Sequence, residues 1–454
     1  MIQSLNPATG QVMRSFTPHS DSEVDDILRA TDAAFRAWRQ TSFDTRGGLM
    51  RAAGDTLRSQ TDRLARMMVM EMGKPISQAR AEVDKCAWVC DYYAANAAGF
   101  LTRDAIATDA SESFVSYQPL GVILAVMPWN FPFWQVFRFA APTLMAGNGA
   151  VLKHASNVPR CALAIEEIFS DAGFPPHLFR TLMIGGDSVE RVIQTREVRA
   201  VSLTGSTEAG RAVGRAAGAA LKKVVLELGG SDPYVILEDA DLPEAVRTCV
   251  TSRLINNGQS CIAAKRFIVP GRILPEFERM FVEVMEARRV GDPMKEQTDV
   301  GPLARVDLRA ELQDQVSRSI DLGAKCLLGG TIPEGDGAYY PPTVLTNVQP
   351  GMPAFDEELF GPVAAIVPAS DEEEAIELAN RSAFGLGAAV FTRNLVRGTR
   401  IAEEELDAGA CFVNAFVRSD PRLPFGGVKE SGYGRELGPH GIREFVNIKT
   451  VYVS

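Results

Sequence analysis

The sequence predicts an α/β fold, and three observations carry this prediction. Short apolar runs without polar alternation, such as residues 121–127, are typical of strands buried on both faces of a sheet. Segments with apolar residues at helical spacing separate these runs. The chain has 454 residues, too many for one hydrophobic core. Together these features predict two Rossmann-like domains, each a parallel sheet covered by helices, and a separate β-ribbon.

The first hundred residues are predicted to be mainly helical. Ser20 and Glu23 form a capping box that marks the start of a helix. Apolar residues follow at helical spacing from Val24 to Trp38, and helices continue through residues 46–103. Residues 105–120 then alternate like an exposed strand, as do residues 450–454. Neither strand has a helix beside it in the sequence, so both are expected to pair with other strands.

Strands and helices alternate from residue 121 to residue 228. The expected strands are residues 121–127, 150–152, 180–184, 200–203 and 223–228, and the expected helices are residues 133–145, 159–171, 188–195 and 207–219. A second series begins at residue 233. Its expected strands are residues 233–237, 266–269, 364–367, 388–391 and 411–414, its expected helices are residues 243–256, 275–287 and 371–380, and a further helix and strand lie within residues 305–328. Ligands bind such sheets at the carboxyl ends of the strands.

The composition disfavours several classes of protein. The net charge is −10 and no basic block occurs, so neither nucleic acid nor an anionic membrane is an expected partner. Seven scattered cysteines do not form a disulfide framework, and four distant histidines disfavour a zinc or haem site, so no metal is expected. The N-terminus lacks a signal sequence and no run of 18 apolar residues occurs. A soluble protein of a reducing compartment, the cytoplasm, is therefore expected.

Cys261 is the candidate nucleophile. It follows the polar turn Asn256-Asn-Gly-Gln-Ser260 and precedes an expected strand, so its thiol is expected to project from a loop into a cleft. The alternative is a small buried hydrophobic residue, which is what most free cysteines are. A free thiol has a pKa of about 8.5 and is only about 3% thiolate at pH 7, so catalysis requires nearby groups that activate it.

Polar residues at four strand ends are candidates for such groups. Asn130 lies between two prolines and offers an amide donor, although turn asparagines are common. Lys153 and Ser156 can bind ribose or phosphate, or can simply be solvated. Residues 204–210 open a helix and favour an anion, but they lack the full dinucleotide-binding fingerprint. Glu227 ends a buried strand, where a carboxylate is either paired or able to act as a general base.

Six motifs, in this order, resemble the aldehyde dehydrogenase superfamily over essentially the whole chain. They are Pro128-Trp-Asn-Phe-Pro132, Leu203-Thr-Gly-Ser-Thr207, Leu226-Glu-Leu-Gly-Gly230, Asn257-Gly-Gln-Ser-Cys261, Glu357-Glu-Leu-Phe-Gly-Pro362 and Pro424-Phe-Gly-Gly427. Within the superfamily the chain is most similar to the compact bacterial NADP-type succinate-semialdehyde dehydrogenases. The resemblance implies a cofactor-binding domain (residues 1–104 and 120–227), a catalytic domain (228–427) and an oligomerisation ribbon (105–119 and 428–454) of a homodimer or homotetramer.

The resemblance also assigns roles to single residues. It implies that an aldehyde is oxidised through a thioester on Cys261, that Asn130 stabilises the oxyanion, and that Glu227 activates the hydrolytic water. The cofactor-binding residues that it implies are Trp129, Lys153, Ser156, Gly205, Ser206, Leu228, Glu358 and Phe360.

Two further predictions concern selectivity. Ser156 stands where NAD-selective members tend to have a carboxylate, so NADP is expected to be preferred, with NAD possible. Arg138 and Ser419 are expected to bind the carboxylate of succinate semialdehyde, since a guanidinium suits a carboxylate; the alternative for Arg138 is helix capping or an interface ion pair. Ile255 replaces a second substrate arginine of some relatives, and Ala263 leaves Cys261 without a neighbouring cysteine for a regulatory disulfide.

Other functions stay open at this point. The substrate can be another semialdehyde or a neutral aldehyde, and CoA or phosphate can replace water as the acyl acceptor, although Glu227 argues against that. From a different class, the chain can be a catalytically silent structural or binding homologue, which the intact Cys261, Glu227 and Asn130 disfavour.

Overall fold

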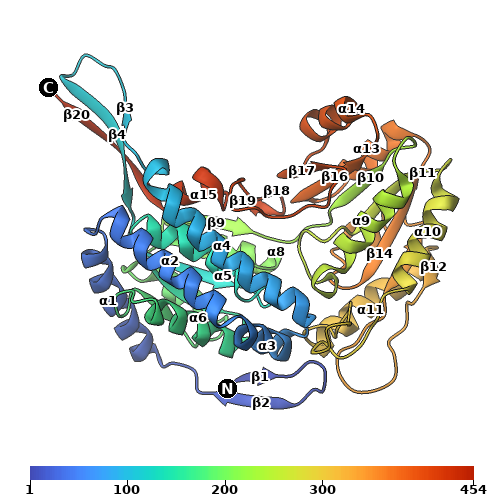
Figure 1. Cartoon of the computed structure of the whole chain (residues 1–454), viewed down its shortest axis with the longest axis horizontal. Coiled ribbons are helices and arrows are strands. Elements are labelled where there is room, and N and C mark those ends of the chain that lie inside the picture. Colours follow the sequence, from blue (N-terminus) through green and yellow to red (C-terminus); the bar gives the residue numbers. More distant parts are fainter.

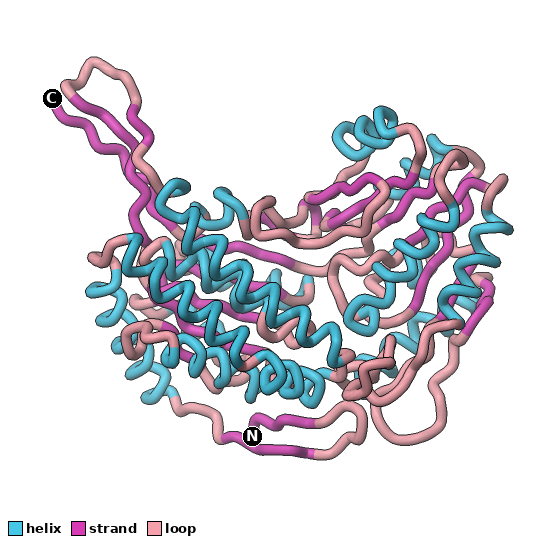
Figure 2. The backbone as a smooth tube through the Cα atoms, viewed as in Figure 1, coloured by secondary structure: helices cyan, strands magenta, loops and turns pink.

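The computed structural model describes all residues, 1–454, and confirms the α/β fold. Figure 1 shows two lobes side by side, each a sheet with helices packed against it, and a ribbon that projects from the outer end of the first lobe. The tube view in Figure 2 separates the strands of the two lobes from the helices that cover them.

The N-terminal segment forms a hairpin and four helices. Strands β1 (Ile2–Leu5) and β2 (Val12–Phe16) pair antiparallel, which the sequence did not predict because both are short. Helices α1 (Asp21–Trp38), α2 (Phe43–Ser59), α3 (Thr61–Met72) and α4 (Ile76–Phe100) follow. The predicted capping box is confirmed, since Ser20 and Glu23 each accept a hydrogen bond from the other's backbone N–H. None of the helices has the length and apolar character that crossing a membrane requires.

The first lobe contains a six-stranded sheet in the order β19-β9-β8-β5-β6-β7. Its strands are β5 (Val122–Met127), β6 (Gly149–His154), β7 (Phe179–Thr181), β8 (Val198–Thr204), β9 (Lys223–Glu227) and β19 (Gly432–Tyr433). Its helices are α5 (Trp134–Met145), α6 (Pro159–Asp171), α7 (Val189–Gln194) and α8 (Thr207–Ala219). All strands except β19 run parallel, as predicted, although β7 ends three residues earlier than expected.

The strand register of this sheet positions the candidate site. Met127 at the end of β5 pairs with His154 at the end of β6, and Val126 pairs with Leu203 of β8. Thr204, which ends β8, pairs with Glu227, which ends β9. The segments that carry Asn130, Lys153, Gly205 and Glu227 therefore leave the sheet at one edge, the carboxyl edge where ligands bind in this architecture.

The second lobe contains a seven-stranded sheet in the order β12-β13-β14-β11-β10-β16-β17. Its strands are β10 (Pro233–Ile236), β11 (Arg266–Pro270), β12 (Lys325–Leu328), β13 (Thr343–Thr346), β14 (Val363–Ala369), β16 (Gly387–Phe391) and β17 (Ala410–Val413). Its helical segments are α9 (Leu242–Leu254), the 3-10 turn η1 (Ile255–Gly258), α10 (Leu274–Glu286), α11 (Val306–Asp321), α12 (Pro353–Asp356), α13 (Glu372–Asn380), α14 (Leu395–Arg400) and the π-helical turn η2 (Ile401–Glu405). Only β12 is antiparallel, and β13 was not predicted.

The ribbon is a three-stranded antiparallel sheet of β3 (Asp104–Ala105), β4 (Glu112–Pro119) and β20 (Val446–Val453). It is shorter than expected at its C-terminal part. In residues 428–445, β18 (Val428–Lys429) pairs with β15 (Phe384–Gly385), β19 joins β9, and α15 (Gly438–Arg443) follows. Because β18 and β19 have two residues each, no alternation in the sequence marks them as strands.

Glu82 on α4 fixes the start of α5. Its carboxylate forms an ion pair with Lys74, and both side chains are almost completely buried. Its Oε1 atom accepts hydrogen bonds from the backbone N–H groups of Phe133 and Trp134, at 2.9 Å each. These N–H groups have no partner within the helix, so the carboxylate satisfies them and also complements the positive end of the helix dipole.

We predict that Glu82→Ala lowers the free energy of unfolding by about 3–5 kcal/mol, because it leaves a buried ammonium and two N–H groups without a partner. The control is Asp84→Ala on the same helix, an exposed carboxylate that forms no ion pair; its effect is expected to stay within about 0.5 kcal/mol. Urea unfolding followed by circular dichroism measures both. Equal effects of the two substitutions would contradict the capping role of Glu82.

Candidate active site

Cys261 lies on a loop between α9 and β11 that has an unusual backbone. The φ angles of Asn256, Asn257 and Gly258 are 56°, 59° and 74°, so three consecutive residues adopt the left-handed backbone conformation. Asparagine and glycine tolerate this region best. At Gly258 a Cβ atom would lie 2.2 Å from the carbonyl oxygen of Gly361, so only glycine fits.

Side chains tie this loop to both lobes. Asn257 donates from Nδ2 to the carbonyls of Gly73 in the first lobe (3.0 Å) and Pro302 in the second (2.9 Å). Its Oδ1 atom accepts from the N–H of Gly301 at 2.8 Å. The backbone N–H of Asn256 donates to Oε1 of Gln78 on α4, at 2.7 Å. The thiol is therefore carried by a rigid turn at the junction of the lobes.

Asn130 lies against this loop. Its Nδ2 atom donates to the carbonyl of Gln259 at 3.1 Å, and Asn256 donates to the carbonyl of Asn130 at 2.7 Å. The side chain is buried, and its Oδ1 atom has no hydrogen-bond partner. One amide hydrogen of Asn130 is thus used by the loop, and the second stays available as a donor.

The surroundings of the Cys261 thiol act on its pKa in opposite directions. Burial is the largest influence and raises the pKa to about 12, even though Lys265 and Arg138 act to lower it. Lys265, which the sequence analysis did not single out, is fully buried and donates to the carbonyls of Ser260 (2.7 Å) and Cys261 (2.6 Å). The resting thiol is therefore protonated, and two cations favour its conversion to the thiolate.

Glu227 is a buried carboxylate without a hydrogen bond. Neither of its oxygens has a partner. Burial raises its pKa well above the ordinary value, Arg138 opposes this rise, and Glu436 adds to it. A buried acid of this kind is held ready to exchange a proton.

The charge of Arg138 acts on both the Cys261 thiol and the Glu227 carboxylate. The arginine is buried, forms an ion pair with Glu436, and donates from Nη2 to the hydroxyl of Thr204 at 3.2 Å. Arg138 therefore lines the predicted site, but its charge is already balanced by a carboxylate of the same chain. This ion pair, and the presence of Glu436, could not be read from the sequence.

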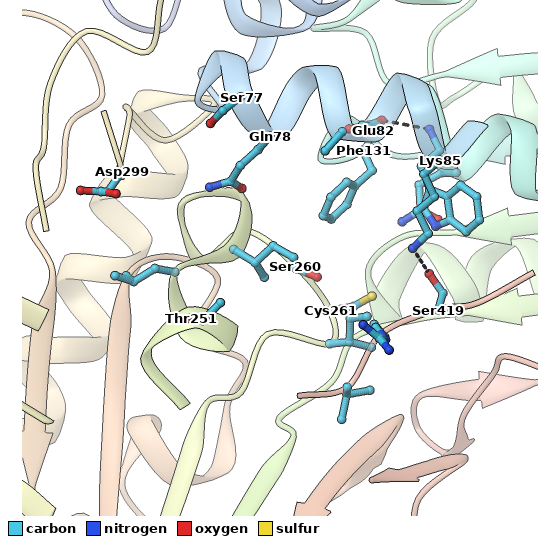
Figure 3. A pocket seen from close by; sticks show the side chains of 18 of the residues that line it. Ser77, Gln78, Glu82, Lys85, Phe131, Thr251, Ser260, Cys261, Asp299 and Ser419 are labelled. Atoms are coloured by element: carbon cyan, nitrogen blue, oxygen red, sulfur yellow. Dashed lines mark hydrogen bonds between the residues drawn. The ribbon is translucent and has the colours of Figure 1, made fainter. Parts of the chain in front are cut away.

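A cavity of about 430 Å³ opens beside the thiol. It lies between α4 and α5 of the first lobe and α9 of the second, and it brings together Cys261, Arg138 and Ser419. Its apolar lining includes Phe131, Trp134 and Phe425. Figure 3 shows Cys261 below Phe131 and beside Ser419, with Lys85 on α4 joined to Ser419 by a hydrogen bond of 2.8 Å. The size and lining are those of a small-molecule site.

The predicted cofactor-binding residues lie along the carboxyl edge of the first sheet. Lys153 at the end of β6 is largely buried and forms no ion pair or hydrogen bond, so its ammonium can accept a phosphate; Ser156 beside it is exposed. Gly205 and Ser206 precede α8, where Ser206 caps the helix by accepting from the N–H of Ala209. The helix N-terminus favours an anion. An unpaired cation and an open helix end thus fit the phosphates of NADP.

The remaining predicted residues lie nearer to the thiol. Trp129 and Phe360 pack edge to face with ring centres 5.6 Å apart. Glu358 accepts from the N–H of Gly230 at 3.1 Å and lies 3.3 Å from Nζ of Lys265. Leu228 packs beneath α8, where a Cβ on Gly210 would lie 2.5 Å from it. No group of three or more His, Cys, Asp or Glu side chains is arranged to hold a metal ion.

This arrangement is suited to covalent catalysis by a thiol. The charge of Arg138 acts on both the Cys261 thiol and the buried Glu227 carboxylate, and Asn130 bonds to the loop that carries the thiol. A cavity gives a small molecule access to the sulfur.

The comparisons with known proteins agree with this chemistry. The model of the aldehyde dehydrogenase family matches residues 1–451. A Synechocystis protein named as a probable NADP(+) succinate-semialdehyde dehydrogenase is 52% identical, with 100% of both chains covered. An Escherichia coli protein named as an NAD(P)+ succinate semialdehyde dehydrogenase is 48% identical, with 99% of this chain and 97% of that protein covered.

Solved structures give the same result. The crystal structure of succinic semialdehyde dehydrogenase from Streptococcus pyogenes, in complex with NADP+ as the cofactor, superposes with a TM-score of 0.97 at 38% identity, and both chains are covered completely. The resemblance seen in the six motifs is thus confirmed over the whole chain. The chain belongs to the aldehyde dehydrogenase family.

Proposed function

We propose that this protein oxidises succinate semialdehyde to succinate with NADP, and that Cys261 is the nucleophile. The observation that carries the proposal is the cavity in which the Cys261 thiol faces a polar wall containing Arg138, Ser419 and Lys85. A substrate with an aldehyde at one end and a carboxylate at the other matches this combination. The names of the relatives in Synechocystis, E. coli and S. pyogenes support the same substrate.

The first step is attack of the Cys261 sulfur on the aldehyde carbon. The thiol must lose its proton, and Lys265 and Arg138 stabilise the thiolate that forms. The new C–S bond converts the carbonyl oxygen into an oxyanion. Asn130 and the backbone N–H of Cys261 are the proposed donors to this oxygen, and one such donor is typically worth about 3 kcal/mol in the transition state.

The second step turns the thiohemiacetal into a thioester on Cys261. NADP+, when bound, supplies the hydride acceptor for this oxidation. Glu227 then takes a proton from water, the water oxygen bonds to the thioester carbon, and the C–S bond breaks. The products are the carboxylic acid and the free thiol. Arg138 favours the ionised form of Glu227 that this step requires.

The proposed cofactor contacts explain a preference for NADP. Lys153 is a largely buried cation without a partner, and Ser156 places a hydroxyl rather than a carboxylate beside it. A 2′-phosphate is attracted by the lysine and meets no negative charge at residue 156. Gly205 and Ser206 are proposed to bind the pyrophosphate, Glu358 the nicotinamide ribose, and Trp129, Leu228 and Phe360 to form the walls.

We further propose that the protein is a cytoplasmic homo-oligomer that assembles through its ribbon. The ribbon projects from the first lobe in Figure 1. It exposes large apolar and aromatic side chains. Ile448 is 63% exposed and Tyr452 is 54% exposed. A strand edge and apolar side chains in this position suit pairing with a second copy of the chain.

Replacing the nucleophile tests the proposal most directly. Cys261→Ala is expected to reduce NADPH formation from succinate semialdehyde to the background rate, because no sulfur is left to carry the acyl group. The matched control is Cys326→Ala, which removes an exposed thiol on β12 and should leave the rate unchanged. Absorbance at the NADPH band measures both. Retained turnover in Cys261→Ala would overturn the mechanism.

The cofactor preference is tested at residue 156. Ser156→Glu is expected to lower kcat/KM for NADP by at least about tenfold, equivalent to about 1.4 kcal/mol, while kcat/KM for NAD stays the same or rises. The new carboxylate would repel the 2′-phosphate but can bind ribose hydroxyls. Steady-state rates with both cofactors provide the measurement. Wild-type protein that uses NAD as well as or better than NADP would contradict the assigned preference.

Glu227→Gln is expected to separate the chemical steps and to change the pH dependence of stability. One NADPH per active site should form rapidly, after which turnover should be slow, because the thioester lacks a base for hydrolysis. Stopped-flow absorbance measures this burst. A steady rate equal to that of the wild-type protein would exclude Glu227 as the base.

The same variant should be more stable than the wild-type protein at neutral pH. The folded state holds the Glu227 proton more tightly than the unfolded state, so the wild-type protein loses stability as pH rises from the ordinary pKa of 4.5 toward the raised folded pKa. Glutamine avoids this loss. The difference in Tm should therefore be small at low pH and grow across this window; a difference that is independent of pH would contradict the raised pKa.

A further inference from the structure

Lys85 is a cation at the cavity that the six motifs do not include. It lies on α4, its side chain lines the same cavity as Cys261, and it forms no ion pair with any carboxylate of the chain. Partial burial removes hydration from the ammonium group of Lys85, and a hydrogen-bond acceptor or an anion can replace that hydration. An anion bound in the cavity would supply the counter-charge that Lys85 lacks within the chain.

Two contacts orient the ammonium. Its Nζ atom donates to Oγ of Ser419 at 2.8 Å, and it lies 4.2 Å from the centre of the Trp134 ring. The Ser419 hydroxyl accepts from the lysine, so its own proton stays available to donate. Figure 3 shows this pair on one side of Cys261, with Ser77 and Asp299 at the far side of the cavity. Lysine and serine together present two donors to an anion next to the thiol.

The other cations that line the cavity are less suited to this role. Arg138 is paired with Glu436 and bonded to Thr204. Arg288 is half-buried and forms no ion pair, but no hydrogen bond or ring contact fixes the direction of its guanidinium.

Arg418 is exposed, and its guanidinium lies 5.9 Å from the ring of Phe416. Lys85 is thus the cavity cation that combines burial, a fixed direction and an unbalanced charge.

The acidic groups near Lys85 do not neutralise it. Glu82 on the same helix is paired with Lys74 and bonded to the start of α5. Asp420 is paired with Arg422. Burial, with Arg138 as the next contribution, lowers the pKa of Lys85 to about 8. A group with this pKa is still about nine-tenths protonated at pH 7, and a bound carboxylate would raise its pKa further.

We propose that Lys85, together with Ser419, binds the carboxylate of the substrate and thereby gives the site its preference for anionic aldehydes. This inference rests on the proposed aldehyde oxidation at Cys261. Lys85 provides the charge and one donor, and Ser419 provides the second donor. Arg138 stays paired with Glu436 and acts on the same region only through its field.

The test compares succinate semialdehyde with butanal, a neutral aldehyde of the same chain length, in the full-length protein with NADP. For Lys85→Met, kcat/KM for succinate semialdehyde should fall roughly 10- to 100-fold, mainly through KM, since a hydrogen bond to a charged group is lost. The value for butanal should change by less than about threefold, because the cavity keeps its volume. Lys85→Arg should restore much of the preference, and Lys325→Met, on exposed β12, should leave both substrates unchanged.

The outcomes separate the inference from the proposed function. If the wild-type protein prefers succinate semialdehyde and Lys85→Met keeps that preference, the inference fails and the proposed function stands. If Arg138→Met alone removes the preference, Arg138 leaves Glu436 to bind the substrate and the inference also fails. Equal losses for both aldehydes in Lys85→Met would indicate a merely structural role and overturn it.

If the wild-type protein instead prefers a different anionic aldehyde and Lys85→Met abolishes that preference, the inference holds and the succinate assignment fails. If the wild-type protein does not distinguish anionic from neutral aldehydes, both fail.

Discussion

The active site depends on a turn in which three consecutive residues have left-handed backbone conformations. Asn256, Asn257 and Gly258 reverse the chain between α9 and β11, and this reversal directs Cys261 toward the junction of the two lobes. Such a turn is costly for most residues. Here the amide of Asn257 offsets the cost by bonding to carbonyls of both lobes. The position of the sulfur is thus set by the packing of the lobes and by the loop's own geometry together.

Buried charge is the second feature that organises the site. Arg138, Glu227 and Glu436 lie together without solvent, and the fully buried Lys265 pairs with the partly exposed Glu358. Removing these groups from water costs free energy, and removing one member of a pair costs more than the pair contributes. Such an arrangement contributes little to stability but holds proton affinities away from their ordinary values. Carboxylates and a thiol with shifted pKa values are what the proposed chemistry requires.

Much of the fold could be predicted from the sequence because local features marked the elements. Helices α6 and α8 begin and end at the predicted residues, since Pro159 starts the first and Ser206 caps the second. The strands β13, β18 and β19 could not be predicted. They have four residues or fewer, and they exist because the edge of another strand is available to pair with them.

The candidate site was predictable to a similar extent. The resemblance pointed to Cys261, Asn130, Arg138 and Ser419; of these, Cys261, Arg138 and Ser419 line one cavity, and Asn130 bonds to the loop that carries Cys261. They did not identify Glu436 or Lys85. A single charged residue on a helix or in a loop is usually solvated, and its partner lies hundreds of positions away: Lys85 meets Ser419, and Arg138 meets Glu436. Only the folded chain brings such groups together.

The antiparallel contact between β9 and β19 has a consequence for biosynthesis. Gly432 pairs with Glu227, which lies about 200 residues earlier in the sequence, and β20 pairs with β4. While the rest of the chain is being translated, the β9 edge of the first sheet has no strand paired with it, and β19 does not yet lie beside Glu227. During synthesis this lobe therefore keeps a free strand edge until the segment that contains β19 has emerged, so its sheet is completed only after the strands of the second lobe have been translated.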